Sequence, residues 1–360
     1  MKGIKLVSEK VLVLGGAGFI GSSIAIALKQ SHPDWQITCF DNLRRRGSEL
    51  NLPRFKHHDI SFLHGDVRST TDLDPSVLRV DTIIDCSAEP SVLAGFSSPQ
   101  YVLQTNLVGT INILELARQV DAKLLFLSTS RVYPIMALKS LKLNVQDTRI
   151  AIAPYQDILG ISERGITEDF PLKGYRSIYG ATKLASELLI EEYQAAYKVP
   201  AIINRCGVIT GQWQMGKVDQ GVFVLWMAAH YFKKPLKYIG YGGLGKQVRD
   251  LLFIDDLTQL IDYQVAHFTD LSGEIFNVGG GLKTSLSLLE TTQICEEITG
   301  HTISIQSVSE ERQDDIPIFI TDPSKVIQRT GWEPTTSPIL ALENIYEWIR
   351  EHEADLRSIL

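Results

Sequence analysis

Short strand-like runs, separated by helical patterns, dominate the first part of the chain. The runs occupy residues 11–14, 37–41, 60–67, 82–88 and 123–127, and apolar positions recur at helical spacing over residues 20–28 and 101–118. Runs that are apolar on both faces are typical of parallel strands covered by helices. The alternation predicts an α/β fold with a doubly wound parallel sheet, which binds its ligands at the carboxyl ends of the strands.

The middle of the chain is less regular. Residues 134–174 show little periodicity, mixed charge and several turn-forming residues, and they predict a long excursion from the sheet. A substrate lid and a mobile surface insertion are both compatible with this composition. A helical pattern resumes at residue 179 and continues to residue 193.

The turn after the first strand carries the first candidate chemistry. Its glycines, Gly15, Gly16, Gly18 and Gly21, fit both a Gly-x-x-Gly-x-x-Gly and a Gly-x-Gly-x-x-Gly spacing. Such glycines allow a tight turn, a close approach of the backbone to a pyrophosphate, and packing of helix on strand. Asp41 ends the second strand about 20 residues further on, where a carboxylate accepts hydrogen bonds from ribose hydroxyls. These features predict a dinucleotide site.

The arginines at positions 44–46 bear on which dinucleotide binds. Their guanidinium groups would neutralise the 2′-phosphate of NADP, whereas Asp41 would repel that phosphate and accept from a free 2′-hydroxyl. The carboxylate therefore favours NAD as the cofactor.

A tyrosine and a lysine form the second candidate site. Tyr179 and Lys183 are four residues apart, which puts them on one face of the predicted helix. A lysine ammonium beside a phenol stabilises the phenolate and lowers its pKa toward neutrality, which suits the phenolate to take a proton from an alcohol. Thr129 follows the fifth strand, at the edge of the sheet where ligands bind. Threonine is also common there as a cap, so the prediction depends on the three residues together.

Composition narrows the class of partner. The 360-residue chain has a formal net charge of −7, which argues against nucleic acid and acidic membranes and favours a small molecule. No apolar run is long enough to span a bilayer, and the first residues lack the apolar core of a signal peptide, so a cytoplasmic protein is expected. The four cysteines are far apart and have no histidine at ligand spacing, so we expect packed thiols and no metal site.

These motifs together resemble the extended short-chain dehydrogenase/reductase family, whose members act on nucleotide sugars. The resemblance extends to two arginines near the end of the chain. Arg249 stands in Gly-Lys-Gln-Val-Arg-Asp, and Arg312 opens Arg-Gln-Asp-Asp; both segments are similar to those with which the family binds the substrate diphosphate. Two guanidinium groups that converge on a diphosphate make physical sense, because their fork matches phosphate oxygens.

The resemblance implies a site at the level of residues. It implies that Thr129, Tyr179 and Lys183 are catalytic. It implies substrate binding by Thr129, Arg249 and Arg312. The residues that it implies for NAD binding are Gly15, Gly18, Phe19, Ile20, Gly21, Asp41, Asn42, Asp66, Val67, Ser87, Ala88, Asn106, Tyr179 and Lys183.

Within the family, residues 144–149, 219–221, 245–250 and 285–290 are similar to epimerases that invert C2 of a CDP-linked 3,6-dideoxyhexose. The implied reaction is a transient oxidation to a keto-sugar, with Tyr179 as the base and Thr129 hydrogen-bonded to the reacting oxygen. An epimerase acting at C4 would use the same residues, and a non-catalytic dinucleotide-binding regulator is the alternative from another class. Dehydration is disfavoured, because Ser130 and Arg131 stand where 4,6-dehydratases carry an acid and a base.

The resemblance also implies the architecture. We expect a Rossmann-type domain over residues 1–210 and 248–280, and a smaller C-terminal substrate-binding lobe over residues 211–247 and 281–360. The family implies a homodimer formed through the helices near residues 103–118 and 179–197.

Overall fold

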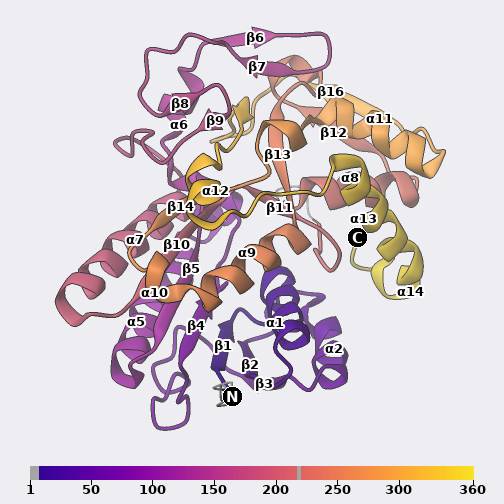
Figure 1. Cartoon of the computed structure of the whole chain (residues 1–360). Coiled ribbons are helices and arrows are strands. Elements are labelled where there is room, and N and C mark those ends of the chain that lie inside the picture. The colour runs from indigo at the N-terminus through magenta and orange to yellow at the C-terminus, as the bar shows by residue number, and fades with distance from the viewer. Residues whose placement is uncertain (1–7, 217–219) are drawn as a thin grey trace, which may run out of the picture.

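A seven-stranded parallel sheet forms the base of the structure, a computed structural model that describes residues 8–216 and 220–360 (Figure 1). Residues 1–7, on which the signal-peptide expectation depends, lie outside the described part. The predicted α/β fold is confirmed, because every neighbouring pair in this sheet is parallel. In spatial order the strands are Ser61–His64 (β3), Gln36–Asp41 (β2), Lys10–Leu14 (β1), Thr82–Asp85 (β4), Lys123–Thr129 (β5), Ala201–Cys206 (β10) and Ile275–Val278 (β14).

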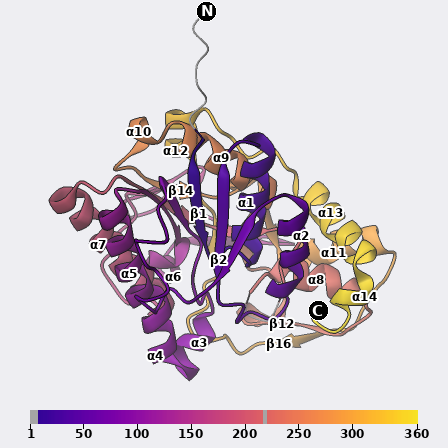
Figure 2. The same cartoon turned by 90° about the horizontal axis from the view of Figure 1, so that it is seen from below.

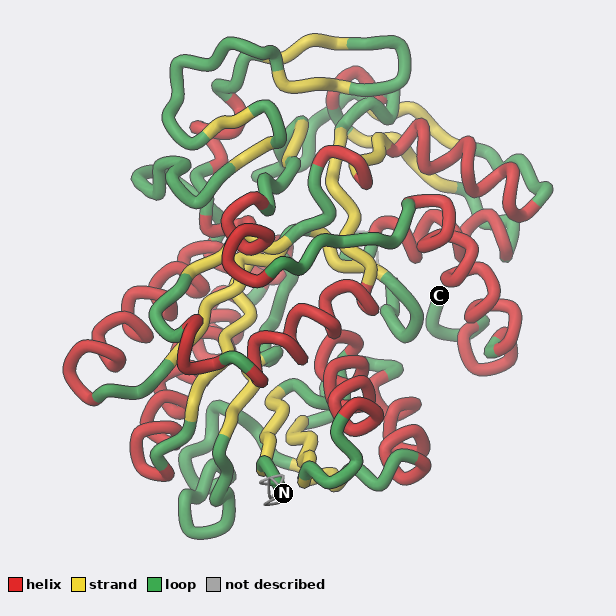
Figure 3. The backbone as a smooth tube through the Cα atoms, viewed as in Figure 1, coloured by secondary structure: helices red, strands yellow, loops and turns green. Residues whose placement is uncertain are grey.

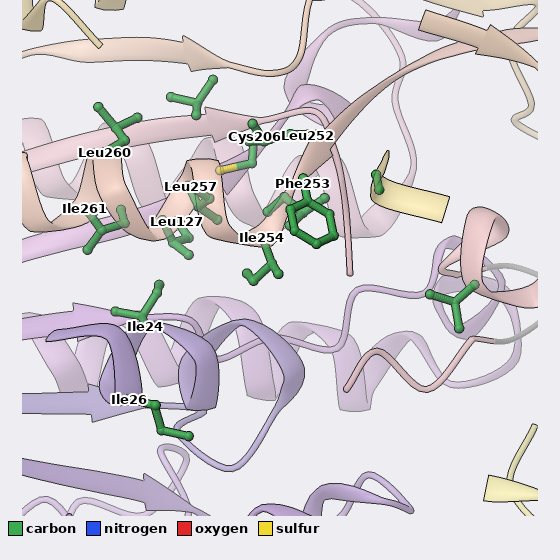
Figure 4. Packing of buried hydrophobic residues seen from close by; sticks show 14 of the residues in the cluster. Ile24, Ile26, Leu127, Cys206, Leu252, Phe253, Ile254, Leu257, Leu260 and Ile261 are labelled. Atoms are coloured by element: carbon green, nitrogen blue, oxygen red, sulfur yellow. The ribbon is translucent and has the colours of Figure 1, made fainter. Parts of the chain in front are cut away.

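Helices cover both faces of this sheet (Figure 2). Phe19–Ser31 (α1) and Ile254–Ala266 (α9) lie on one face, and Gly109–Val120 (α5) and Ile178–Tyr197 (α7) lie on the other. Alternate residues of β1 pack into separate hydrophobic clusters, one on each face, because successive side chains of a strand point to opposite sides. Figure 4 shows Ile254 and Ile261 of α9 pointing toward the helix that carries Ile24.

The predicted helix over residues 101–118 is interrupted. It consists of Pro99–Leu103 (α4), a π-helical turn at Gln104–Val108 and then α5. π-Helical turns are rare and occur mostly as single turns inside α-helices, frequently at functional sites. Here the turn carries Asn106, one of the residues implied for NAD binding.

The second lobe contains a four-stranded sheet (Figure 3). Val248–Phe253 (β13) runs parallel to Val208–Thr210 (β11) and Ile318–Phe319 (β17), and antiparallel to Ser285–Ser287 (β15). These pairings place β13 in the smaller sheet. The next elements in the chain return to the large sheet, because α9 packs on its face and β14 is one of its strands. The other elements of this lobe are Val222–Tyr231 (α8), Leu236–Ile239 (β12), Leu288–Thr299 (α11), Ile305–Val308 (β16), Ser324–Thr330 (α12), Pro338–Glu351 (α13) and Glu353–Leu356 (α14).

The excursion over residues 134–174 is a packed unit at the top of Figure 1. It contains the helix Ile135–Lys139 (α6) and two small antiparallel ribbons. Their apolar residues form a cluster with Phe170 and with Phe319 of β17, which attaches the excursion to the second lobe. The ribbons pair Leu143–Val145 (β6) with Ile150–Ile152 (β7), and Ile161–Ser162 (β8) with Gly165–Ile166 (β9).

The remaining described elements are short. Three are α-helices: Leu52–His57 (α2), Val92–Ser97 (α3) and Phe268–Leu271 (α10). Four are 3₁₀ helices: Ser48–Asn51, Ser130–Val132, Tyr241–Gly243 and Leu282–Thr284. Within the described residues, no helix combines the length and the apolar character needed to cross a membrane. All four cysteines are unpaired, and three of them are buried.

Candidate active site

The glycine turn brings β1 and α1 close to the end of β4. Gly15 has φ +68°, and a Cβ on it would lie 2.9 Å from the carbonyl group of Cys86. A Cβ on Gly21 would lie 2.3 Å from the carbonyl oxygen of Gly15. Both positions therefore require glycine because a side chain would not fit, and Gly15 requires it also for its positive φ. The turn is as tight as a pyrophosphate-binding turn needs to be.

Asp41 closes this turn from the neighbouring strand. One carboxylate oxygen accepts from the backbone N–H of Ala17 (3.1 Å), and the other accepts from that of Leu43 (2.8 Å). Burial raises the pKa of Asp41, and these backbone donors oppose the rise. The carboxylate lies at the carboxyl end of β2, on the wall of the largest cavity described below.

A cavity of 740 Å³ runs along the carboxyl ends of the sheet strands. It joins the glycine turn to the candidate catalytic residues Thr129, Tyr179 and Lys183. Most of the residues implied for NAD binding lie on its wall: Gly15, Gly18, Phe19, Ile20, Gly21, Asp41, Asn42, Val67, Ser87 and Ala88. Asp66, Asn106, Arg249 and Arg312 are not among the described residues that line it.

Asp66 and Asn106 lie behind the wall and hold residues that form it. Asn42 donates to the Asp66 carboxylate (2.9 Å), and hydrogen bonds from Arg68 hold the pKa of Asp66 well below its usual range. Asn106 accepts from the backbone N–H of Glu89 (2.8 Å) and donates to the backbone carbonyl of the same residue (3.1 Å). Both side chains thus support loops at the cavity rather than face it.

The start of α7 is fixed against the end of β5. The Ser177 hydroxyl caps the helix by accepting from the backbone N–H of Gly180 (3.2 Å). A Cβ on Gly180 would lie 2.1 Å from the carbonyl oxygen of Arg131, so only glycine allows this approach. Thr129, the last residue of β5, accepts from the backbone N–H of Arg131 (3.2 Å). Thr129 and Tyr179 are thereby held on one wall.

The pKa of Tyr179 departs from the prediction. Burial raises the pKa of Tyr179 to about 12, and hydrogen bonding with Thr129 and the charge of Arg131 oppose the rise. The ammonium of Lys183 lies 3.9 Å from the centre of the Phe126 ring and interacts with the charge of buried Asp85. Lys183 is therefore not among the groups that oppose this rise, and the catalytic roles of Tyr179 and Lys183 stay predictions.

A buried polar network supports the wall from behind. Glu187 of α7 and Arg205 of β10 form an ion pair at 2.8 Å, with side chains only 2% and 5% exposed. Ser128 donates to the Glu187 carboxylate (2.5 Å), and Arg205 also donates to the Tyr133 hydroxyl (3.3 Å). The sequence motifs described above do not include this network. Its one signal is the position of Glu187, one helical turn after Lys183.

Arg249 contacts a short segment of the second lobe, residues 312–316, here called the strap. Its guanidinium donates to the Asp315 carboxylate (3.0 Å) and to the backbone carbonyl of Ile316 (2.8 Å). Arg312 begins the strap, and the N–H of Asp315 donates back to its carbonyl (3.2 Å). The convergence of Arg249 and Arg312 on a diphosphate stays a prediction.

Arg131 is a cavity residue that the sequence analysis did not assign to binding. It lies on the same wall as Thr129 and Tyr179, and its guanidinium donates to the backbone carbonyl of Asp314 in the strap (3.3 Å). Its position two residues after Thr129 was the available signal.

A second, smaller cavity of 440 Å³ lies between α1, α9 and α13. Trp213 lies on the walls of both cavities, and the Arg54 guanidinium covers its ring at 4.2 Å. In the described part of the chain, no three His, Cys, Asp or Glu side chains gather as metal ligands would.

Comparison with known proteins supplies a family and several relatives. The model of the NAD dependent epimerase/dehydratase family matches residues 11–279. CDP-paratose 2-epimerase of Salmonella typhi is 28% identical over 348 residues, covering 94% of this chain and 98% of that protein. The low-salt glycan biosynthesis protein Agl12 of Haloferax volcanii is 31% identical over 330 residues, covering 91% and 94%.

A solved structure shares the fold. It is a mutant UDP-glucuronic acid 4-epimerase of Bacillus cereus in complex with UDP-4-deoxy-4-fluoro-glucuronic acid and NAD. The two chains are 25% identical with a TM-score of 0.78, and the match covers 95% of this chain and 99% of the other.

Proposed function

The chain belongs to the NAD-dependent epimerase/dehydratase family, and from that premise we propose that it inverts C2 of a CDP-linked 3,6-dideoxyhexose. Family membership makes it an NAD-dependent enzyme of nucleotide-sugar metabolism. The finer assignment is supported by the likeness to CDP-paratose 2-epimerase, which extends over nearly the whole of both proteins. The residues at 245–250 and 285–290 support the same subgroup.

The residues present fit NAD. The Gly15–Gly21 spacing forms a turn that a Cβ would fill, and Asp41 lies at the strand end where the adenosine ribose would bind. When bound, NAD supplies an acceptor that takes a hydride from the sugar carbon and returns it. Ser87 and Ala88 line the cavity between the turn and the catalytic wall, on the path that a dinucleotide would follow.

One observation carries the proposed chemistry: Thr129 and Tyr179 lie on one wall of the cavity that begins at the glycine turn. Tyr179 takes the hydroxyl proton of the sugar as a phenolate, and Thr129 hydrogen-bonds the same oxygen as negative charge develops on it. Burial places the pKa of the phenol at about 12, so positive charge close to Tyr179 is needed for it to act at neutral pH. The keto-sugar then presents its opposite face, and configuration inverts.

Dehydration is a weaker alternative. The acid and base that 4,6-dehydratases carry after the threonine are replaced here by Ser130 and Arg131. A guanidinium stays protonated and therefore does not act as a base. Both side chains lie on the cavity wall, so the replacement affects the site itself.

The first experiment is proton NMR of CDP-paratose incubated with the purified protein. Tyr179→Phe is the test variant, and Tyr193→Phe is the matched control, because Tyr193 lies on the same helix and its hydroxyl bonds Glu115. Wild type and the control should yield the C2-inverted sugar, and Tyr179→Phe should not.

Two other outcomes would change the assignment. Inversion at C4 of UDP-glucose or UDP-glucuronic acid, without turnover of CDP-paratose, would assign the same residues to a 4-epimerase. Retention of NAD without turnover of any of these sugars would favour a non-catalytic dinucleotide-binding regulator.

The proposal includes a homodimer formed through the helices near residues 103–118 and 179–197, which are α5, α7 and the end of α4. Leu103, Ile111 and Leu188 are exposed on this helical surface, with exposed fractions of 38–56%. Unpaired apolar side chains on neighbouring helices are typical of a surface that a second copy covers. Light scattering should give twice the chain mass, and Leu188→Asp together with Ile111→Asp should give monomers.

A further inference from the structure

Two guanidinium groups and a phenol from separate parts of the chain lie around Asp315 of the strap. Arg249 and Asp315 form an ion pair at 3.0 Å, with side chains 16% and 19% exposed. The backbone N–H of Ile316 also donates to the same carboxylate oxygen (2.9 Å). An anion is therefore already bound at Arg249, and it is supplied by the protein itself.

Arg131 adds a second positive charge to this group. Burial lowers the pKa of Arg131, and the nearby charge of Arg249 lowers it further. Its guanidinium donates to a neutral backbone carbonyl, that of Asp314 (3.3 Å). Among the described residues, no Asp or Glu oxygen lies within 4.0 Å of its guanidinium nitrogens. The charges of Asp315 and Asp314 oppose the lowering of the Arg131 pKa, and of these two strap carboxylates only Asp315 forms an ion pair within the described part of the chain, which is with Arg249.

Tyr241 provides an independent observation. Its hydroxyl is buried and has no hydrogen-bond partner among the described residues. Burial raises the pKa of Tyr241, as do the charges of Asp315 and Glu311, while Arg249 and Arg131 oppose the rise. Geometry places Tyr241 close to the strap, because a Cβ on the preceding Gly240 would lie 3.3 Å from the Cα of Glu311. A buried donor without an acceptor is costly, so it points to an acceptor that binds here.

The strap is attached by contacts that an incoming ligand can replace. The Tyr175 hydroxyl donates to the Asp314 carboxylate at 2.8 Å on an exposed part of the surface. Asp314 has φ +62°, a left-handed conformation that is uncommon for a residue with a side chain. The ion pair between Arg249 and Asp315 is the strongest of these contacts, because both groups are charged and mostly buried.

We propose that Arg131, Tyr241 and Arg249 form a cradle that binds the substrate diphosphate. The Asp315 carboxylate occupies part of this cradle until the diphosphate displaces it. The identity of the ligand rests on the proposed function, because this diphosphate is part of the proposed nucleotide-sugar substrate. Arg131 lies on the cavity wall beside Tyr179, so it connects the phosphate site to the reacting sugar. A diphosphate offers these two guanidinium groups and the hydroxyl more acceptor oxygens than a single carboxylate does.

The test is the affinity of the NAD-loaded protein for CDP and for UDP, measured by titration calorimetry. Arg131→Gln should weaken binding by about 10-fold or more, because it removes a hydrogen bond to a charged group. Tyr241→Phe should weaken it several-fold, and Asp315→Asn should strengthen it. Tyr238→Phe is the matched control, since its hydroxyl bonds Thr292 outside this group (2.6 Å). Arg131→Lys should restore part of the loss.

Each result bears on the cradle separately from the proposed function. Unchanged affinity for CDP and UDP in both Arg131→Gln and Tyr241→Phe would overturn the proposal, and so would weaker binding in Asp315→Asn. If wild type binds neither CDP nor UDP, the cradle is refuted. Intact CDP binding without epimerisation refutes only the proposed function. Thermal unfolding checks that every variant is folded.

Discussion

Glu187 and Arg205 show how single buried charges support the catalytic wall. Replacing one partner leaves the other charge buried without compensation, which typically costs about 3–5 kcal/mol. We therefore expect Glu187→Leu to lower the free energy of unfolding by about this amount, measured by urea denaturation. The double variant with Arg205→Met should lose much less, because both charges are gone. Equal losses in the single and the double variant would contradict the buried-pair account.

Asp66 makes a pH-dependent contribution to stability. Arg68 lowers the pKa of Asp66 in the folded protein, so its contribution is complete above the unfolded-state pKa and is lost as the pH falls through the folded-state pKa. Asp66→Asn should therefore be less stable than wild type at pH 7, and the difference should shrink as the pH falls below about 4. Urea denaturation at a series of pH values measures this. Arg68→Gln should remove the same pH-dependent part of the free energy of unfolding. If wild type and Asp66→Asn differed by the same amount at every pH, the Asp66–Arg68 pair would not explain the difference.

At this scale the sequence predicts which residue types form the site better than it predicts where their charges point. The spacing of Tyr179 and Lys183 predicts one helix, and α7 carries both. The direction of the Lys183 ammonium depends on Asp85 and Phe126, which lie on neighbouring strands of the sheet. Contacts of this kind form only when distant segments meet, so residue spacing within one helix cannot reveal them.

At the scale of elements, the junction between β5 and α7 decides the geometry of the catalytic wall. Gly180 allows the helix to approach Arg131, and a methyl group there would overlap the carbonyl oxygen of that residue. Gly180→Ala should therefore destabilise the fold by about 1–3 kcal/mol, although alanine favours helices in general. It should also lower kcat more than Ala181→Ser, at the exposed neighbouring position. A stabilised, fully active Gly180→Ala protein would show that the contact is unimportant.

Element prediction succeeded where apolar runs are long enough to show a period. The five runs of the N-terminal part correspond to β1–β5. Strands covered on both faces are largely apolar, as β1, β2, β4 and β5 are, whereas β3 is an edge strand with mostly exposed side chains. The ribbons of residues 134–174 contain strands of two or three residues, too short for any alternation to be read. The π-helical turn was missed because its apolar residues keep nearly the helical spacing.

At the scale of the whole molecule, Arg45 joins the two lobes beside the dinucleotide site. Its guanidinium donates to the Gln220 side chain (2.7 Å) and to the backbone carbonyl of Met215 (2.7 Å). Arg45→Ala should accelerate the loss of bound NAD by about 10-fold, since charge-assisted hydrogen bonds close this side of the cavity. Arg46→Ala is the control, because Arg46 makes one longer bond to Ser358 (3.3 Å). The measurement is the amount of NAD that each variant retains over time after gel filtration. Equal retention by Arg45→Ala and Arg46→Ala would show that the Arg45 contacts do not slow the release of NAD.

The order of strands in the large sheet has a consequence for the chain during its synthesis. β10 is buried along its whole length, yet the strand that covers its outer edge, β14, follows only after residues 207–274 have been added. While the ribosome makes that stretch, β10 is an edge strand with unpaired backbone groups, which invites pairing with another nascent chain. Expression yield should therefore depend on how quickly translation passes through residues 207–274 and on the chaperones that shield the emerging edge.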